Sequence, residues 1–277
     1  MIPTRILGKT GVEVTTLGLG GEGILRTFGH ENEAYELINR ALDLGITYFE
    51  SARAYAGSEF YYGKALKERR KEIFLTSKSH ARDKRNALIH LEETLKNMNT
   101  DHLDLWQVHD VRSEADVKTI FGSGGAIEAF AEAKQKGLTR FIGVTGHYDP
   151  IILGRCIKMF DFDTVLLPVN PAEMKFKSFL EHVLPLALKK NMGIVGMKVY
   201  FHGFAKSLQG FASLMPFMYF ALSQPIATVV IGCDDTKQLQ ENVNFACAFK
   251  PMRGGEMEEI IRHISPFARE LMHYKPQ

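Results

Sequence analysis

Short apolar strand patterns alternate with longer helical patterns along the whole chain, and this alternation constrains the fold more than any other feature. Strand patterns lie at 15–20, 46–50, 72–78, 103–109, 140–145, 163–169, 194–198 and 226–231. Helical patterns lie between and after them at 31–44, 58–69, 84–97, 125–136, 150–159, 184–191, 211–223, 236–248 and 256–272. Strands connected through helices run parallel, and closing eight of them removes both sheet edges. The sequence predicts an α/β fold, a single (β/α)₈ TIM barrel that occupies residues 1–277 as one domain.

The N-terminal stretch 5–21 precedes the first helical pattern and predicts a small β-hairpin, turned at 9–11, followed by the first barrel strand. A doubly wound open sheet is the alternative architecture. It is disfavoured because the first strand ends in GLGGEG rather than in the dinucleotide-binding pattern G-x-G-x-x-G.

Charge, apolar runs and cysteines exclude several classes of protein. The 34 basic and 32 acidic residues leave a net charge of +2, which provides no field for nucleic acid or an anionic membrane. No apolar run approaches the roughly 18 residues of a spanning helix. The three cysteines form no C-x-x-C pair, and the N-terminus lacks an apolar signal core. We therefore expect a cytoplasmic protein with no metal site.

Polar residues stand at or just after the ends of three successive predicted strands. Glu50 ends one strand and Tyr55 follows it, Lys78 ends the next, and His109 ends the third. Barrel enzymes carry their chemistry at the carboxyl ends of the strands. A tyrosine there could give a proton to a carbonyl oxygen if a neighbouring lysine favoured the phenolate. Glu50 would hold the lysine ammonium, and His109 would orient the carbonyl oxygen.

The remaining strand ends also carry residues that could line a site. They are Gly21 and Glu22, Thr145 and Gly146, Asn170, Lys198, and Gly232, Cys233 and Asp234. A metal centre and a serine triad lack support, because His109 has no second histidine at ligand spacing and no G-x-S-x-G occurs.

The segment YFESARAYAGSEFYYGKAL (48–66) resembles the signature of the aldo-keto reductases, F-D-T-A-x-x-Y-G followed by S-E-x-x-L-G-x-A-L. The family's later landmarks are similar to FLTSK (74–78), DLWQVHD (104–110), RFIGVTGH (140–147) and VVIGCDDTKQLQENV (229–243). The resemblance implies a barrel that reduces aldehydes or ketones with NADP(H) or, less often, NAD(H). It places the catalytic tyrosine, lysine and histidine on Tyr55, Lys78 and His109. The family's aspartate falls on Glu50, whose extra methylene is a departure from the pattern.

The resemblance also implies a set of cofactor positions, with several departures. Thr145 and Gly146 align with the pair that holds the nicotinamide amide, Asn170 is the nearest substitute for the usual glutamine, and Met197 stands where an aromatic ring commonly stacks on nicotinamide. On the last loop Glu241 and Asn242 match residues that contact the adenine. Gly232 and Gln238 replace basic residues that often bind the 2′-phosphate, with Lys237 and Asp234 nearby. The family's habit favours NADP(H).

The substrate is expected to be a small carbonyl compound in a rather open site, because no long loop follows residue 250 and most of segment 200–222 is expected to form the seventh helix. The sequence leaves the oligomeric state open. One alternative function is a nicotinamide-nucleotide-sensing subunit with little turnover, motivated by Glu50. Another is Schiff-base chemistry on Lys78.

Overall fold

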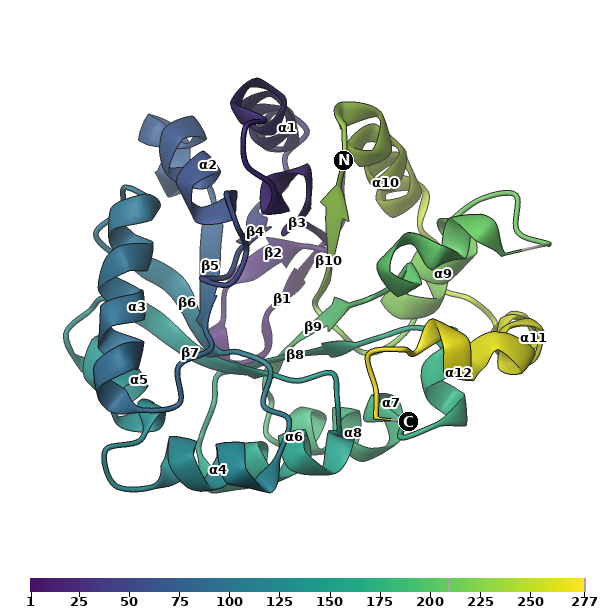
Figure 1. Cartoon of the computed structure of the whole chain (residues 1–277). Helices are drawn as coiled ribbons and strands as arrows, with labels where there is room; N and C mark the ends of the chain where they lie inside the picture. The colour runs from purple at the N-terminus through teal and green to yellow at the C-terminus, as the bar shows by residue number, and fades with distance from the viewer. Residues whose placement is uncertain (209, 277) are drawn as a thin grey trace.

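Eight parallel strands close into a barrel, which confirms the predicted architecture (Figure 1). The computed structural model describes residues 1–208 and 210–276. The barrel strands, each hydrogen-bonded to the next and the last to the first, are β3 (Leu17–Gly23), β4 (Tyr48–Glu50), β5 (Phe74–Ser79), β6 (Leu103–Val108), β7 (Thr139–Thr145), β8 (Thr164–Pro168), β9 (Gly193–Met197) and β10 (Thr228–Cys233).

Helices surround the barrel, and most lie where the 3.6-residue periodicity predicts them. They are α1 (Glu31–Asp43), α2 (Ser58–Ala65), α3 (Lys84–Asn97), α4 (Glu114–Phe121), α5 (Ala126–Gln135), α6 (Pro150–Met159), α7 (Phe179–His182), α8 (Leu184–Lys189), α9 (Met215–Leu222), α10 (Thr236–Ala248), α11 (Gly254–Ile264) and α12 (Ala268–Leu271). Apolar side chains fill the space between the two layers, as where Trp106 of β6 stacks on Phe130 of α5 with ring centroids 3.7 Å apart.

Several helical elements differ from their predictions, among them the expected helix at 256–272, which the 3₁₀ turn Ser265–Phe267 divides into α11 and α12. The helix expected at 58–69 ends at Ala65 and continues as a 3₁₀ helix over Lys67–Glu72, where Lys67 has a positive φ of 43°. Helix α4, which begins at a capping box between Ser113 and Asp116, was not predicted from the sequence. Its eight residues bury only Val117 and Ile120, so the helical periodicity is weak.

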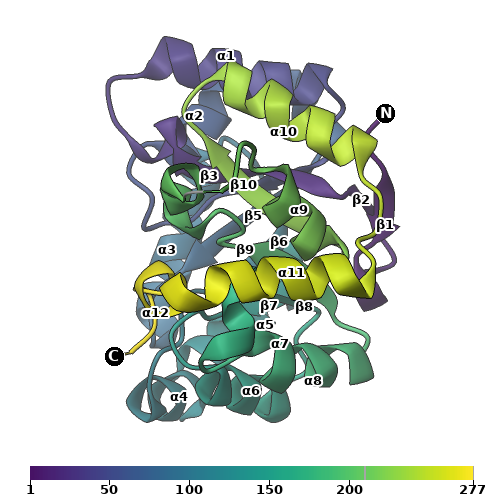
Figure 2. The same ribbon diagram turned by 90° about the vertical axis from the view of Figure 1, so that its right-hand side faces the viewer.

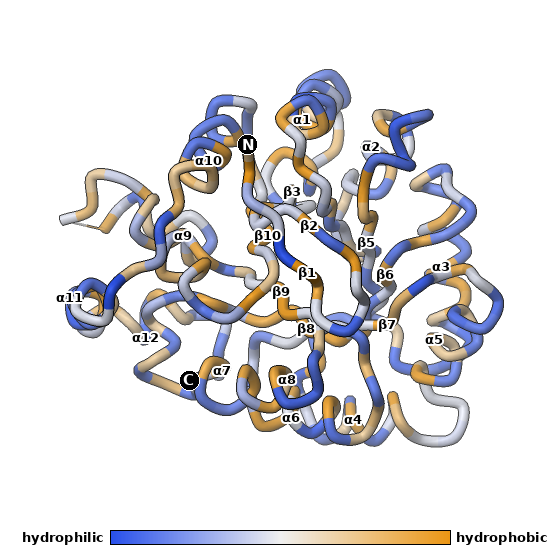
Figure 3. The backbone as a smooth tube through the Cα atoms, turned by 180° about the vertical axis from the view of Figure 1, so that it is seen from behind, coloured by the Kyte–Doolittle hydropathy of each residue, from blue (hydrophilic) through white to orange (hydrophobic). Residues whose placement is uncertain are grey.

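The predicted hairpin is present and lies across the amino-terminal end of the barrel (Figure 3). Strands β1 (Thr4–Ile6) and β2 (Glu13–Thr15) pair antiparallel. Gly8 in the connection has φ +52°, and a Cβ there would lie 2.3 Å from the backbone of Met192 and Gly193. Glycine is required there because only its backbone can approach the start of β9 so closely. Leu7 and Val14 of the hairpin join the apolar cluster inside the barrel, which closes the end opposite the strand carboxyl termini.

The segment after β9 differs from its prediction, since only its second half is the helix α9. Its first half is a 3₁₀ segment, Phe201–Ser207, interrupted at His202 and Gly203, which both have left-handed φ angles. Helix α11 crosses the outside of the barrel between α9 and α7, as two views show (Figures 1 and 2). In the described residues, no helix has both the length and the apolar character that crossing a bilayer requires.

Candidate functional site

Glu50 and Lys78 form a buried ion pair at the carboxyl ends of the neighbouring strands β4 and β5. The pair joins Glu50 Oε1 to Lys78 Nζ, and the side chains are 4% and 1% exposed. The second carboxylate oxygen of Glu50 accepts a hydrogen bond from the Gly21 N–H at 3.0 Å, and Lys78 Nζ donates to the Ser51 carbonyl at 2.7 Å. The longer side chain of Glu50 therefore reaches the lysine. Burial lowers the pKa of Lys78, while the Glu22 carboxylate favours its charged form.

Tyr55 lies above this ion pair, in the turn after β4. Lys78 Nζ is 4.6 Å from the centroid of the Tyr55 ring, and the His109 ring meets it edge to face with centroids 5.9 Å apart. The structure thus brings together all four residues that the sequence grouped. Burial, reinforced by the Glu22 carboxylate, raises the pKa of the Tyr55 phenol above its ordinary value. Burial also holds the pKa of His109 well below its ordinary value, so its imidazole is neutral near pH 7.

Arg26 belongs to the same group of side chains, although it was not predicted from the sequence. Its guanidinium carbon lies 5.0 Å from the centroid of the Tyr55 ring, and its Nη1 pairs with Glu22 at 3.0 Å. Two cations therefore border one aromatic ring, an arrangement that favours a phenolate once the proton has left. The available signal was the four-residue spacing between Glu22 and Arg26, which suits an ion pair but names no chemistry.

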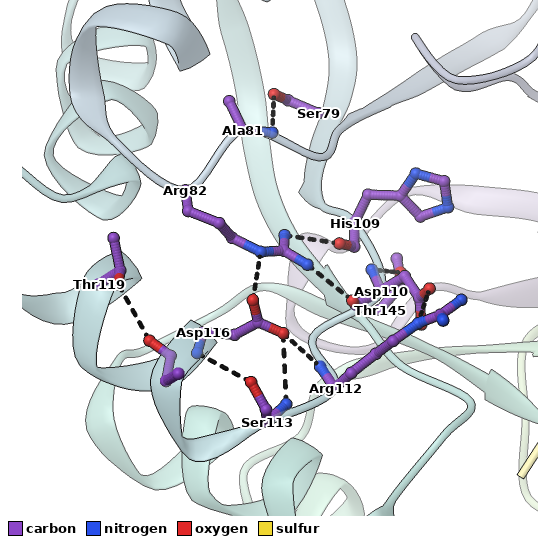
Figure 4. Close-up of polar contacts among 11 residues, drawn as sticks. Ser79, Ala81, Arg82, His109, Asp110, Arg112, Ser113, Asp116, Thr119 and Thr145 are labelled. Carbon is purple, nitrogen blue, oxygen red and sulfur yellow. Dashed lines mark hydrogen bonds and ion pairs between the residues drawn. The ribbon is translucent and has the colours of Figure 1, made fainter. Parts of the chain in front are cut away.

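Arg82, a second residue that was not predicted from the sequence, fixes the loop that follows β6 (Figure 4). Its guanidinium donates to the carbonyl oxygens of His109 and Asp110, both at 2.8 Å, and to Asp116 at 3.0 Å. Asp110 has a positive φ of 53°, and its N–H donates to the Thr145 hydroxyl at 2.8 Å. This network holds the backbone at His109 and Asp110.

The predicted nicotinamide residues lie at the ends of β7, β8 and β9. The Thr145 hydroxyl accepts the Asp110 N–H at 2.8 Å, and a hydroxyl also carries one proton that it can donate. Gly146 follows it, and a Cβ there would meet only ordinary contact with Leu153. Asn170 is fully buried, and its Nδ2 donates to the Lys198 carbonyl at 3.2 Å. Met197 packs beside the apolar cluster inside the barrel.

Residues of the last predicted loop serve contacts within the protein. Cys233 is buried and receives a 3.5 Å hydrogen bond from Asn242, whose side-chain oxygen accepts from the Tyr200 hydroxyl at 2.8 Å. Burial raises the pKa of the Cys233 thiol to about 12, so it is protonated. Two hydrogen bonds join Gln238 and Asp234. The Asp234 N–H donates to Gln238 Oε1, and Gln238 Nε2 donates to Asp234 Oδ2, each at 3.1 Å.

The other predicted cofactor residues of these loops differ in their exposure to solvent. Glu241 and Lys237 of α10 are exposed. Gly21 and Gly232 pack closely against their neighbours, so a Cβ at Gly21 would lie 2.8 Å from the Glu50 carbonyl and one at Gly232 would lie 2.7 Å from Glu22. A cofactor contact at these positions remains a prediction.

The C-terminal residues reach the barrel mouth, which was not predicted from the sequence. Tyr274 packs edge to face on His147 with centroids 5.9 Å apart, and Lys198 Nζ lies 4.9 Å from the centroid of its ring. Its hydroxyl lies 3.1 Å from Asn170 Nδ2. The residues after α12 therefore form one wall of the barrel mouth, a contact between distant parts of the chain that no local pattern reports.

Charged and imidazole groups border this wall. Lys198 has a positive φ of 57°, its Nζ contacts His202 Nε2, and burial lowers its pKa to about 8. His147 Nε2 lies 3.2 Å from Asp110 Oδ1. Across residues 1–208 and 210–276, no three histidine, cysteine or carboxylate side chains are grouped so as to hold a metal ion.

Comparisons of the sequence and of the structure with known proteins both find similarity to aldo-keto reductases. A sequence model described as "Aldo/keto reductase family" matches residues 16–213. The chain is 24% identical to the uncharacterized oxidoreductase YqkF of Bacillus subtilis, over 88% of this chain and 91% of that protein. The holo form of aldo-keto reductase AKR11C1 from Bacillus halodurans superposes with a TM-score of 0.79 at 21% identity, covering 95% and 96% of the two chains. An aldo/keto reductase from Klebsiella pneumoniae in complex with NADP and acetate superposes with a TM-score of 0.75 at 17% identity, covering 98% and 96%.

Proposed function

Because the chain belongs to the aldo/keto reductase family, we propose that it reduces an aldehyde or ketone, or oxidises the corresponding alcohol, by hydride transfer with NADP(H). The observation that carries the proposal is the buried pair of Glu50 and Lys78 beneath the Tyr55 ring, with His109 beside it. This arrangement can deliver a proton to a carbonyl oxygen near neutral pH.

The residues at the mouth fit a nicotinamide cofactor. Buried polar atoms that lack a partner among the described residues include Asn170 Oδ1 and His109 Nδ1, and such atoms ordinarily pair with water or a ligand. Thr145 would donate to the carboxamide oxygen, Asn170 would accept from its N–H₂ group, and Met197 would contact the ring face. The complex of the similar Klebsiella protein with NADP supports NADP(H) as the cofactor. The reduced cofactor, when bound, supplies the hydride that the carbonyl carbon receives.

Tyr55 supplies the proton that the carbonyl oxygen needs. Its raised pKa keeps the phenol protonated at neutral pH, and the Arg26 guanidinium, which opposes that shift, favours release of the proton. The proton passes from the hydroxyl to the carbonyl oxygen, which becomes the alcohol oxygen. Lys78 and Arg26 stabilise the phenolate that remains until it recovers a proton from water. His109, neutral and held by its buried backbone, donates a hydrogen bond that orients the carbonyl oxygen. Alcohol oxidation runs the same steps in reverse.

The contact between Glu50 and Lys78 weakens the alternative of a nucleotide-sensing subunit. That alternative depends on a glutamate that fails to hold the lysine, and the structure supplies the ion pair. Lys78 is also 1% exposed and paired, which disfavours its use as a Schiff-base amine.

The test is to mix the purified protein with NADPH and a panel of reactive aldehydes and to follow the loss of nicotinamide absorbance. We expect turnover that Tyr55→Phe abolishes and that Tyr35→Phe, a control on the outer helix α1, leaves unchanged. Titration of NADPH against NADH by fluorescence tests the cofactor preference. Failure to bind either nucleotide would refute the proposal, as would absence of turnover on every aldehyde with Tyr55→Phe identical to wild type.

A further inference from the structure

The last residues of the chain enter a buried polar network behind the barrel mouth. After α12 (Figure 1) the chain returns to the 3₁₀ helix Pro171–Lys175 that follows β8, and Lys275 Nζ lies 5.2 Å from the ring centroid of Phe179 at the start of α7. Lys275 Nζ pairs with Glu173 Oε2 at 2.7 Å, and the Tyr274 hydroxyl donates to Glu173 Oε1 at 2.9 Å. The Phe179 N–H also donates to Glu173 Oε2, at 3.0 Å. These contacts join the last residues of the chain to Glu173, although Tyr274 and Lys275 lie 101 and 102 positions after it in the sequence.

The network is almost completely removed from solvent. Glu173 and Asn170 are 0% exposed, Lys275 is 4% exposed, and Tyr274 is 8% exposed. Lys275 Nζ also donates to the carbonyls of Phe176 and Lys177, at 2.9 and 2.8 Å. Burial raises the pKa of Glu173, and the adjacent Lys275 ammonium opposes that shift. A network with this many partners holds its members in one arrangement, because releasing any one of them leaves a buried polar group unsatisfied.

Hydrogen-bond directions in this network determine how the Asn170 amide is oriented. The Tyr274 proton goes to Glu173, so the phenol oxygen can only accept from Asn170. The Lys198 carbonyl, the second neighbour of Asn170, is also an acceptor. Both neighbours therefore require the N–H₂ group of Asn170. Its oxygen, Oδ1, remains buried without a partner in the described part of the chain.

We propose that Tyr274 is a positioning residue for the cofactor. It holds the Asn170 amide so that Oδ1 is presented as an acceptor for the carboxamide N–H₂ group of the nicotinamide. Glu173 and Lys275 act one step further back, because they fix the direction in which the Tyr274 hydroxyl donates. This inference rests on the proposed function, since it requires a nicotinamide at the mouth. It assigns the C-terminal tail to recognition of the carboxamide rather than to proton transfer.

The experiment compares two cofactors that differ only in this hydrogen bond. Dissociation constants are measured by fluorescence for NADPH and for its reduced 3-acetylpyridine analogue, in which a methyl group replaces the carboxamide N–H₂. The proteins are wild type, Tyr274→Phe, Asn170→Ala and Tyr219→Phe. Tyr219 is a matched control because it is a half-buried tyrosine on α9 whose ring packs on Phe249.

We expect wild type and Tyr219→Phe to prefer NADPH by roughly fivefold, the effect of one hydrogen bond. Asn170→Ala should lose the preference, and Tyr274→Phe should reduce it to about twofold, because the Lys198 carbonyl then holds the amide alone. If Tyr274→Phe does not fold, Glu173→Gln carries the same expectation, since a glutamine amide can donate to Tyr274 and release the phenol proton toward Asn170.

An unchanged preference in folded Tyr274→Phe would overturn the inference. Tighter binding of both cofactors by Tyr274→Phe would also overturn it, since the tail would then be an obstruction at the mouth. Failure of wild type to bind NADPH at all would instead refute the proposed function, so the two failures can be told apart.

Discussion

Shortening Glu50 by one methylene tests whether this glutamate is fitted to its surroundings. The aldo-keto reductase signature has aspartate at this position, so Glu50→Asp brings the chain closer to the family pattern. In the structure, however, the Glu50 carboxylate bridges two groups, with one oxygen on Lys78 Nζ and the other on the Gly21 N–H. An aspartate carboxylate would lie about 1.5 Å nearer the backbone and could not keep both interactions.

The magnitude follows from the burial of both partners. Lys78 is 1% exposed and Gly21 is buried, so breaking the interaction at either residue leaves an unsatisfied group without access to water. An unsatisfied buried group of this kind costs about 1–3 kcal/mol. For a domain of this size that lowers the melting temperature by roughly 2–5 °C. We also expect kcat to fall, because Lys78 would no longer be held beneath the Tyr55 ring.

The assay is thermal unfolding of the free protein together with steady-state reduction of an aldehyde at saturating NADPH. Glu36→Asp, on the exposed face of α1, is the control and should stay within about 0.5 kcal/mol of wild type. A Glu50→Asp protein that is as stable as wild type and turns over at least tenfold faster would refute this reasoning. It would support the nucleotide-sensing alternative, in which the glutamate suppresses turnover.

Three further predictions concern the proton donor, the mouth and the tail. Tyr55→Phe should lower kcat by roughly 10²–10⁴-fold while the NADPH dissociation constant stays constant; equal losses in binding would contradict a role in proton transfer. The pKa of Lys198 is lowered to about 8, so its ammonium is charged below that pH and neutral above it. Binding of the anionic cofactor should therefore weaken as the pH rises through about 8, and Lys198→Met should flatten that dependence in a fluorescence titration. Lys275→Met should lower the free energy of unfolding by about 3–5 kcal/mol, because Glu173 keeps a buried and uncompensated charge. Denaturant unfolding measures this change, and a decrease below about 1 kcal/mol would show that the ion pair contributes little to stability.

Much of the barrel could be predicted from local sequence patterns, because they reflect local physics. Helix α6 occupies Pro150–Met159 as predicted, with Asp149 as its N-cap and proline in its first turn. Helix α4 could not be found in this way, since a short helix that buries two side chains leaves almost no periodicity. The 3₁₀ segment after β9 was missed because Phe201 and His202 have left-handed φ angles, which residues of these types seldom adopt and which no local pattern indicates.

The grouping of Glu50, Tyr55, Lys78 and His109 also followed from sequence, because parallel strands bring their carboxyl ends to one mouth whatever else the chain does. Sequence could not decide whether Glu50 reaches Lys78. Glutamate is about 1.5 Å longer than aspartate, and whether that length fits depends on the distance between the backbones of β4 and β5.

Sequence by itself therefore determined the barrel and the strand ends at which chemistry could occur, because strand and helix periodicities are local and topology follows from right-handed connections. Only the tertiary structure placed Arg26 against the Tyr55 ring and brought Tyr274 and Lys275 to Glu173 and Asn170. Contacts of this kind join residues far apart in the chain, and their formation depends on the path of every element between them.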